Sequence, residues 1–259
     1  MRDFRVIPVL LLQDRGVVKT VRYRKPRYIG DPVNTVRIFN EKEVDELVLL
    51  DVDATPRRRA VDVELVRQIA SEAFMPIAYG GGVRTLEEMH TLFRVGVEKV
   101  ILGAAAAEDP ELVRRAATEF GSQSVLVSVD VHRPLLGGPG VYTHRGRRRT
   151  GQAPAAYARR MQELGAGEIL LNDVDRDGTM QGYDLELVRQ VAAAVDVPVV
   201  ACGGAGSLRH LVEVCRRAGA SAAAAGSVFV YQGPLKGVLI TYPREGDVQR
   251  EMGALMEAA

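Results

Sequence analysis

The sequence predicts a (β/α)₈ barrel, because short apolar segments alternate with amphipathic ones and the second half of the chain repeats the first. Residues 78–106 are echoed by residues 201–229. Gly80 matches Gly203 and Gly103 matches Gly226, each 123 residues later. A doubly wound sheet would not explain a repeat of half the chain. No linker divides the sequence, so we expect one barrel domain over residues 1–259, built from two duplicated half-barrels.

Eight apolar runs are predicted to be buried parallel strands. Their hydrophobicity is nearly continuous, whereas half-exposed antiparallel strands alternate apolar and polar residues. In chain order, the runs are Val6–Leu12, Leu47–Val52, Pro76–Tyr79, Val97–Leu102, Ser124–Val129, Ile169–Leu171, Val197–Ala201 and Ala222–Ala225.

Helix start motifs precede several of the segments between these runs. Asp31–Pro32 and Asp109–Pro110 each offer a cap residue followed by a first-turn proline. Thr85 and Glu88 have the spacing of a capping box. These intervening segments are therefore predicted to be the helices of the barrel.

The composition indicates where the protein is located and which classes of partner it lacks. The chain has 34 basic and 33 acidic residues, so it has no general attraction for nucleic acid or membranes. Its two cysteines cannot form a disulfide framework or a four-ligand zinc site. No apolar run approaches the ~20 residues of a membrane span. We expect a cytoplasmic protein without a metal ion or cofactor.

Two long basic loops are expected at the barrel mouth, where the strands end and catalytic groups gather. They are Gln13–Gly30, which contains Lys19, and Val131–Ala153, which contains an arginine run. Such a run is either a solvated face or a loop that closes over an anionic substrate. The sequence leaves both interpretations open.

Glycine turns at the strand ends predict phosphate sites. Gly80–Gly82 and Gly203–Gly204 each end a strand and open a helix, where backbone N–H groups can face a phosphate. Such glycines can also be purely steric, but two duplicated sets favour an elongated bis-phosphate ligand. The candidate phosphate-binding residues are Gly81, Gly82, Gly103, Asp177, Gly178, Gly203, Gly204, Gly226 and Ser227.

Long motifs give the chain a specific resemblance. They include DELVLLDVDA, YGGGVRTLEE, FGSQSVLVSVD, DRDGTMQGYD and CGGAGSL. Over essentially its whole length the sequence resembles HisF, the cyclase subunit of imidazole glycerol phosphate synthase. The resemblance implies a duplicated half-barrel, ammonia delivered through the barrel by a HisH-like glutaminase, and lyase chemistry that closes an imidazole ring in histidine biosynthesis.

The resemblance also implies two catalytic aspartates, a general acid and a general base, after the first and fifth strands. Asp130 matches the fifth-strand residue. Leu11 replaces the first-strand residue, and leucine can neither give nor accept a proton. Asp14 lies three residues further on, in the expected loop, and is a poor substitute.

Other mouth positions also depart from the family pattern. Gly103–Ala104 replaces an Asn-Thr pair, and Asn172–Asp173 replaces a Thr-Ser pair. We expect the new carboxylate to repel a phosphate. The alternative is neutral drift with the original activity retained. Lys19 and Asp51 are further mouth candidates.

The opposite end of the barrel keeps the family pattern. Arg5, Glu46, Lys99 and Glu168 match the charged ring that gates the ammonia entrance in the family. Its retention suggests a working gate. The alternative is a structural ion-pair ring that persists because removing one partner strands a buried charge.

A retained inlet with an altered mouth favours a paralogue. LLLQD, KTVRY and RYIGDPVN resemble the WbuZ group, HisF-like proteins associated with acetamidino modification of bacterial surface-polysaccharide sugars. The implied partners are a HisH-like glutaminase, a sugar amidotransferase and a phosphorylated small-molecule ligand. We expect an ammonia-relaying subunit. The alternatives are a true cyclase and a non-catalytic scaffold that activates the glutaminase.

Overall fold

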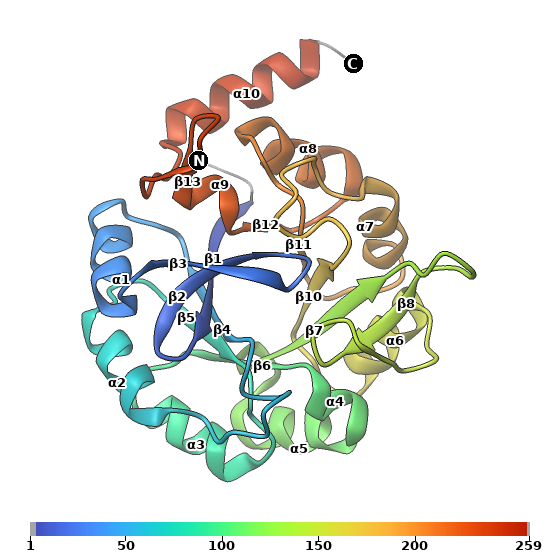
Figure 1. Ribbon diagram of the computed structural model, residues 1–259. Helices are drawn as coiled ribbons and strands as arrows, with labels where there is room; N and C mark the ends of the chain where they lie inside the picture. The colour runs from blue at the N-terminus through green and yellow to red at the C-terminus, as the bar shows by residue number, and fades with distance from the viewer. Residues whose placement is uncertain (1–3, 258–259) are drawn as a thin grey trace.

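The computed structural model describes residues 4–257, within which eight parallel strands close into a barrel (Figure 1). Closure is made where the last strand pairs with the first, with Arg5 opposite Ala222. The predicted strands are all confirmed, and residues 1–3 and 258–259 of the predicted domain lie outside the described part. The barrel strands are β1 (Arg5–Gln13), β4 (Leu47–Asp51), β5 (Ile77–Gly80), β6 (Lys99–Leu102), β7 (Val125–His132), β10 (Glu168–Asp173), β11 (Val199–Cys202) and β12 (Ala222–Ala225).

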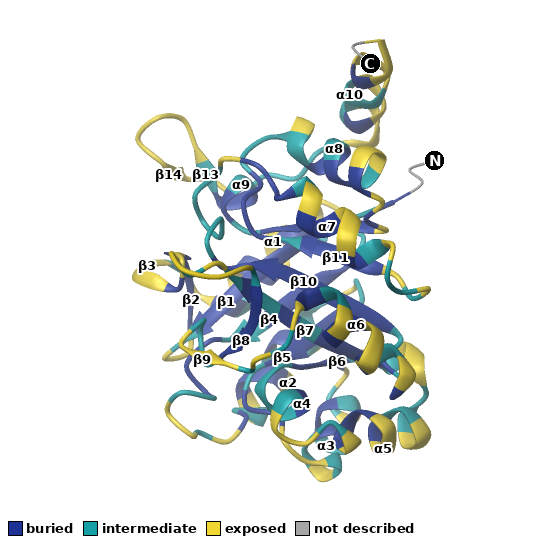
Figure 2. Cartoon of the chain, turned by 90° about the vertical axis from the view of Figure 1, so that its right-hand side faces the viewer, coloured by how far each residue is buried: buried dark blue, intermediate teal, exposed yellow. Residues whose placement is uncertain are grey.

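Helices surround the strands, and the outer faces of these helices are exposed (Figure 2). None of the helices within residues 4–257 is long and apolar enough to cross a membrane. They are α1 (Pro32–Glu41), α2 (Val63–Glu72), α3 (Leu86–Arg94), α4 (Ala104–Glu108), α5 (Glu111–Phe120), α6 (Pro154–Glu163), α7 (Leu185–Ala192), α8 (Leu208–Ala218), α9 (Ser227–Val230) and α10 (Glu245–Glu257), with a 3₁₀ turn η1 (Ser122–Ser124).

Two of the three predicted helix starts are correct. The Asp31 side chain caps α1, and Thr85 forms the capping box of α3. The third was wrong, because Pro110 rather than Asp109 is the N-cap of α5. Helical backbone angles begin at Pro110 (φ −59°, ψ −29°), so Asp109 lies one residue outside the cap position, and its carboxylate accepts a hydrogen bond from Arg115 at 2.8 Å.

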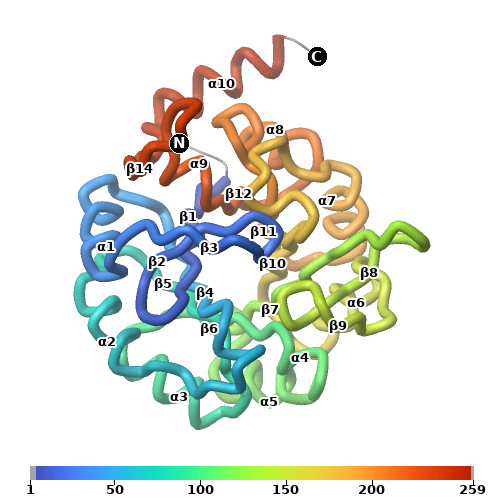
Figure 3. Tube along the Cα trace, in the orientation of Figure 1, coloured from blue at the N-terminus to red at the C-terminus, as the bar shows by residue number. Residues whose placement is uncertain are grey.

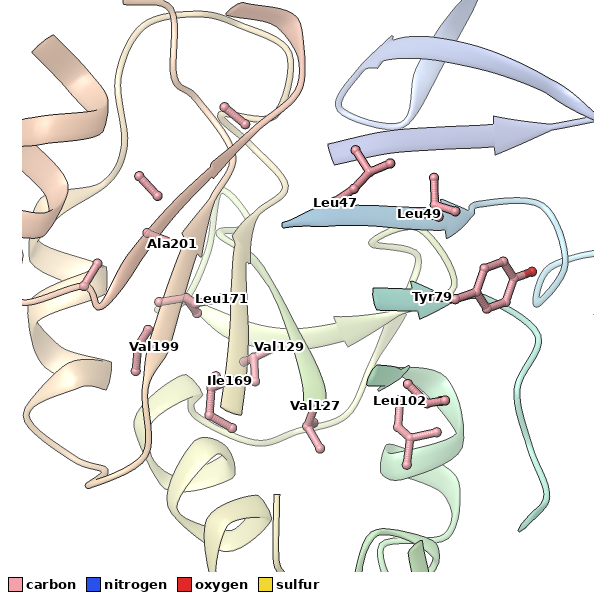
Figure 4. Close-up of a cluster of buried hydrophobic side chains, with 14 of the residues drawn as sticks. Leu47, Leu49, Tyr79, Leu102, Val127, Val129, Ile169, Leu171, Val199 and Ala201 are labelled. Carbon is pink, nitrogen blue, oxygen red and sulfur yellow. The ribbon is translucent and has the colours of Figure 1, made fainter. Parts of the chain in front are cut away.

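The strands are apolar on both faces because two cores flank them. One core fills the barrel interior and includes Val9, Leu11 and Leu170. The other lies between strands and helices, and Figure 4 shows Leu49 and Ile169 among its side chains. Two buried faces explain why the strands appear in the sequence as continuous apolar runs.

Both long mouth loops fold back as β-hairpins, which the sequence did not predict. The first is β2 (Gly16–Val21) with β3 (Arg24–Gly30), and the second is β8 (Gly140–Thr143) with β9 (Arg148–Arg149). The first hairpin crosses over the barrel opening (Figure 3). β2 pairs with β1, and β8 pairs with β7, so the two hairpins extend the internal duplication to the mouth. A short third hairpin joins β13 (Tyr231–Gln232) to β14 (Gly237–Val238).

Candidate active site at the barrel mouth

Asp130, the predicted catalytic acid, lies beside Asn172 at the mouth. The two residues are directly opposite each other in the pairing of β7 with β10. The Asn172 side-chain Nδ2 donates to Asp130 Oδ1 at 3.1 Å, and Ser128 Oγ donates to the same oxygen at 3.4 Å. Asn172, which the sequence showed only as a departure from a family pattern, therefore orients this carboxylate.

Tyr23, at the tip of the first hairpin, completes this cluster. Its hydroxyl lies 3.4 Å from both carboxylate oxygens of Asp130 and accepts a hydrogen bond from Asn172 Nδ2 at 2.9 Å. Arg145, at the tip of the second hairpin, donates to the Tyr23 carbonyl at 2.6 Å. The sequence did not single out Tyr23, because no local pattern distinguishes it from Tyr28 in the same basic loop.

The cluster combines a hydroxyl group that donates hydrogen bonds with a carboxylate that can accept a proton. Burial raises the pKa of Asp130 above its ordinary value. The hydrogen bonds from Asn172, Tyr23 and Ser128 lower the pKa, but burial has the larger effect. Burial and the neighbouring Asp130 raise the pKa of Tyr23 well above its usual range. Tyr23 therefore keeps its proton, while Asp130 is more easily protonated than an exposed aspartate. Asp130 can therefore support general acid-base chemistry, with the Tyr23 hydroxyl beside it as a hydrogen-bond donor.

The equivalent positions of the first half are apolar. In the pairing of β1 with β4, Leu11 lies opposite Leu50. Leu11 is buried in the interior core, where it contacts other apolar side chains. Asp14 lies in the turn between β1 and β2 and pairs with Arg57 at 2.8 Å, with 58% of its side chain exposed. This outward contact leaves it unsuited to replace the missing acid.

The predicted phosphate-binding residues line two cavities, one on each side of the mouth. The cavity of the first half has a volume of about 450 Å³. Its lining includes the predicted residues Asp51, Gly81, Gly82 and Gly103, together with Asp130, Arg58, Arg84, Arg145 and Arg148. The cavity of the second half has a volume of only about 30 Å³. Its lining includes Lys19, Asp177, Gly178, Gly203, Gly204, Gly226 and Ser227.

Lys19 closes the second cavity. Its ammonium donates to the carbonyl of Val9, and a Cβ atom on Gly226 would lie only 2.0 Å from Lys19 Nζ. Burial lowers the pKa of Lys19 to about 8, although Asp177 opposes the shift. Burial likewise raises the pKa of Asp177 to about 6, opposed by Lys19. With Lys19 in this position, the second cavity is too small for a phosphate group.

Asp51 and Asp173 are equivalent turn residues of the two halves. Asp51 Oδ1 accepts hydrogen bonds from the backbone N–H groups of Asp53 and Ala54, each at 2.9 Å. Asp173 Oδ1 likewise accepts hydrogen bonds from the backbone N–H groups of Asp175 and Arg176, at 2.9 and 3.2 Å. The carboxylate of Asp173, which we expected beside a phosphate, is therefore turned toward its own backbone.

The four predicted gate residues form a closed ring at the other end of the barrel. Lys99 Nζ lies 2.9 Å from Glu46 and 3.2 Å from Glu168, and Arg5 pairs with both glutamates. Both glutamates are buried. Burial alone would lower the pKa of Arg5, but its pairing with Glu168 and Glu46 raises it. The ring therefore balances two cations with two anions.

Comparisons with known proteins agree with this architecture. A model of a family described as histidine biosynthesis protein matches residues 5–236. A Pseudomonas aeruginosa protein, provisionally named imidazole glycerol phosphate synthase subunit hisF2, is 51% identical over 92% of this chain and 95% of its own. Provisionally named HisF and hisF3 subunits from Leptospira interrogans and Vibrio vulnificus are 46% and 42% identical, over 94% and 96% of this chain and 96% of each relative. The chain therefore belongs to the histidine biosynthesis protein family and is related to the HisF subunit of imidazole glycerol phosphate synthase.

Proposed function

We propose that this protein is an ammonia-relaying HisF-like subunit, which accepts ammonia from a HisH-like glutaminase and passes it on for amidination of a surface-polysaccharide sugar. The observation that carries this proposal is the contrast between the two ends of the barrel. The charged ring of the family is complete, whereas the first catalytic position is Leu11 packed in an apolar core.

The interior between the two ends supports passage of a small neutral molecule. Val9, Leu170 and Val200 line it, so ammonia would cross an apolar region after leaving the ring. In this arrangement the glutaminase binds around the amino-terminal ends of the strands. A sugar amidotransferase receives the nitrogen at the mouth and carries all or part of the sugar chemistry.

We also propose that a phosphorylated ligand occupies the cavity of the first half. That cavity is large and has four arginines in its lining, whereas Lys19 fills most of its counterpart. Guanidinium groups and glycine N–H groups are suited to a phosphate.

A second candidate function is ring closure in histidine biosynthesis. The Tyr23 hydroxyl favours it, because this group lies beside Asp130 and could act as a second proton-transfer group. Ring closure assayed with the bis-phosphate substrate and ammonia separates the two functions.

The relay is tested in a reaction reconstituted with both partners. Product formed from glutamine is compared with product formed from added ammonia. Lys99→Met keeps much of the side-chain length and removes the charge that pairs with Glu46 and Glu168. We expect it to lower the ratio of glutamine-dependent to ammonia-dependent product by several fold while the complex stays intact. The exposed Lys236→Met is the control and should leave the ratio unchanged.

An unchanged ratio for Lys99→Met in an intact complex would show that the ring is structural. A scaffold that only activates the glutaminase predicts this result, together with a normal rise in glutamine hydrolysis on mixing.

A further inference from the structure

A third cavity at the mouth lies between the tips of the two hairpins. It has a volume of about 180 Å³, and its lining includes Arg22 and Arg24 of the first hairpin and Arg145 and Arg147 of the second. Of its lining residues, Tyr23 and Arg145 also line the large cavity of the first half, and Tyr23 alone lines the small cavity of the second. This hairpin-tip cavity is therefore distinct from the two cavities that contain the glycine turns.

Positive charge exceeds negative charge around the hairpin-tip cavity. Asp175 is the only acidic side chain among the described residues of the lining. Its Oδ1 lies 2.6 Å from His132 Nδ1, and its Oδ2 accepts a hydrogen bond from the backbone N–H of Arg133 at 2.7 Å, so it pairs with none of the four arginines. Arg145 pairs instead with Asp53, which lies outside the lining. Four guanidinium groups and two carboxylates leave an excess of at least two positive charges.

Two of the four arginines have no partner within the described part of the chain. Arg24 and Arg147 make no side-chain hydrogen bond or ion pair with any residue from 4 to 257. By contrast Arg148, the next residue of the same run, pairs with Glu108 at 2.8 Å. The chain as a whole has nearly equal numbers of basic and acidic residues, so the excess at this cavity is local. Unpaired guanidinium groups from two hairpins thus converge on one cavity, which favours a bound anion over a simply solvated surface.

Size, charge and donor geometry favour a phosphate group as this anion. A water needs roughly 10–15 Å³ measured in this way, so the cavity has room for a tetrahedral oxyanion and a few waters. Guanidinium groups form paired hydrogen bonds with phosphate oxygens. A phosphate ester carries about −1.5 to −2 charges at neutral pH, which matches the excess positive charge of the lining. A carboxylate or a chloride ion would neutralise only part of that excess.

We propose that the hairpin-tip cavity binds one phosphate group, held by Arg24 from the first hairpin and Arg147 from the second. Tyr23 and Arg145 line both this cavity and the large one, and Arg145 donates to the Tyr23 carbonyl at 2.6 Å. These two residues form a wall between the cavities, so the phosphate belongs to a second molecule and not to the ligand of the large cavity.

A phosphate group in this position would connect the two hairpins. Arg24 directly follows Tyr23, whose hydroxyl lies 3.4 Å from the Asp130 carboxylate. Binding therefore stabilises the arrangement in which Tyr23 lies beside Asp130. The site does not depend on the proposed relay, because neither Arg24 nor Arg147 lines the large cavity or belongs to the charged ring.

Crystals of the full chain soaked in tungstate, a tetrahedral dianion, test the position of the site. We expect an anomalous peak between Arg24 and Arg147 that inorganic phosphate displaces. The absence of a peak there would overturn the proposal. The bis-phosphate substrate should leave the peak in place. If this substrate displaces the tungstate, the phosphate belongs to the ligand of the large cavity, and the separate site is wrong.

Amide hydrogen exchange tests binding in solution. At constant ionic strength, replacing chloride by inorganic phosphate should slow exchange in β3 and β8 by several fold, because the bound group connects the hairpins. Arg24→Met and Arg147→Met should each raise the phosphate concentration needed for half of this effect by roughly tenfold, since each removes a charged hydrogen bond.

Arg149→Met is the matched control for Arg147→Met. Arg149 is exposed and belongs to the same arginine run, but it does not line the hairpin-tip cavity. Its replacement should leave the phosphate dependence unchanged. Equal losses in the two variants would show general attraction of anions to a basic surface and would overturn the site. A tungstate peak without any effect of phosphate in solution would indicate an adventitious ion only, and would overturn it as well.

Discussion

The two halves of the barrel present different chemistry at equivalent positions. In the first half Leu11 lies opposite Leu50, and in the second half Asp130 lies opposite Asn172. The strand pairing is the same in both, so the backbone tolerates either pair. The fold depends on apolar strands with two buried faces, whereas the chemistry depends on a few side chains at the strand ends.

The mouth hairpins differ in a similar way. Arg22 and Arg145 are 123 residues apart at the two tips, and each contacts the opposite half. Arg145 pairs with Asp53 at 2.6 Å, whereas Arg22 Nε donates to the carbonyl of Asp175 at 2.7 Å. The first hairpin also inserts Lys19 into its cavity. Equivalent hairpins thus fill one mouth cavity and leave the other open.

The largest expected effect comes from making the first half resemble the second. With Leu11 in place, ring closure should be roughly 10²–10⁴-fold slower than in a cyclase with both aspartates, since this is the usual contribution of one general acid or base. Leu11→Asp should raise any residual turnover. The measurement is steady-state ring closure with ammonia and the bis-phosphate substrate.

Turnover within tenfold of an ordinary cyclase would contradict the relay proposal. In that case Tyr23→Phe tests whether the tyrosine hydroxyl has replaced the missing acid. The variant keeps the ring but removes the group beside Asp130, and should then lower turnover and change its pH profile.

A second difference between the halves is electrostatic. Asp177 occupies the turn position at which the first half has Thr55. Its folded-state pKa of about 6 lies above the unfolded value, so the folded state binds the proton more tightly. Its contribution to stability is therefore complete below about pH 4 and is lost as the pH rises through 6.

Asp177→Asn should be most stabilising, relative to the unmodified protein, above pH 6. We expect the difference in unfolding free energy to grow by roughly 1–3 kcal/mol between pH 4 and pH 7. Urea unfolding across this range measures it. A difference that stays constant with pH would show that Asp177 titrates normally.

The barrel was predictable from the sequence, but its mouth hairpins were not. Each barrel strand is buried on both faces and therefore appears as an apolar run. β3 is mostly exposed and carries Arg24, Lys25 and Arg27, so its sequence shows no apolar alternation. Its pairing depends on the tertiary contact of β2 with β1.

Only part of the candidate site could be predicted. Asp130 and the four ring residues follow from motifs on the barrel strands and next to them. The contact of Tyr23 with Asp130 and Asn172 joins residues more than 100 positions apart through a hairpin tip. The closing of one cavity by Lys19 depends likewise on the conformation of one long side chain. Neither leaves a local pattern in the sequence.

Two matched arginine variants separate the two hairpin tips, and the second of them has the smallest expected effect. Asp53 is 1% exposed, and its contact with Arg145 is a charged hydrogen bond, so Arg145→Met leaves a buried carboxylate with Arg57 as its remaining cation. We expect a loss of about 1.5–3 kcal/mol in unfolding free energy. Arg22→Met loses a bond to a backbone carbonyl at an exposed site and should cost about 0.5–1 kcal/mol.

Amide hydrogen exchange in the two hairpins locates these losses. Arg145→Met should speed exchange in β8 and at Tyr23, because the Arg145 guanidinium also holds the Tyr23 carbonyl. Arg22→Met should speed exchange only in β2 and β3. If both variants speed exchange equally in both hairpins, the two tips unfold as one cooperative unit. The difference between the filled cavity of the second half and the open cavity of the first would then belong to one conformation and would not be a fixed property of the two halves.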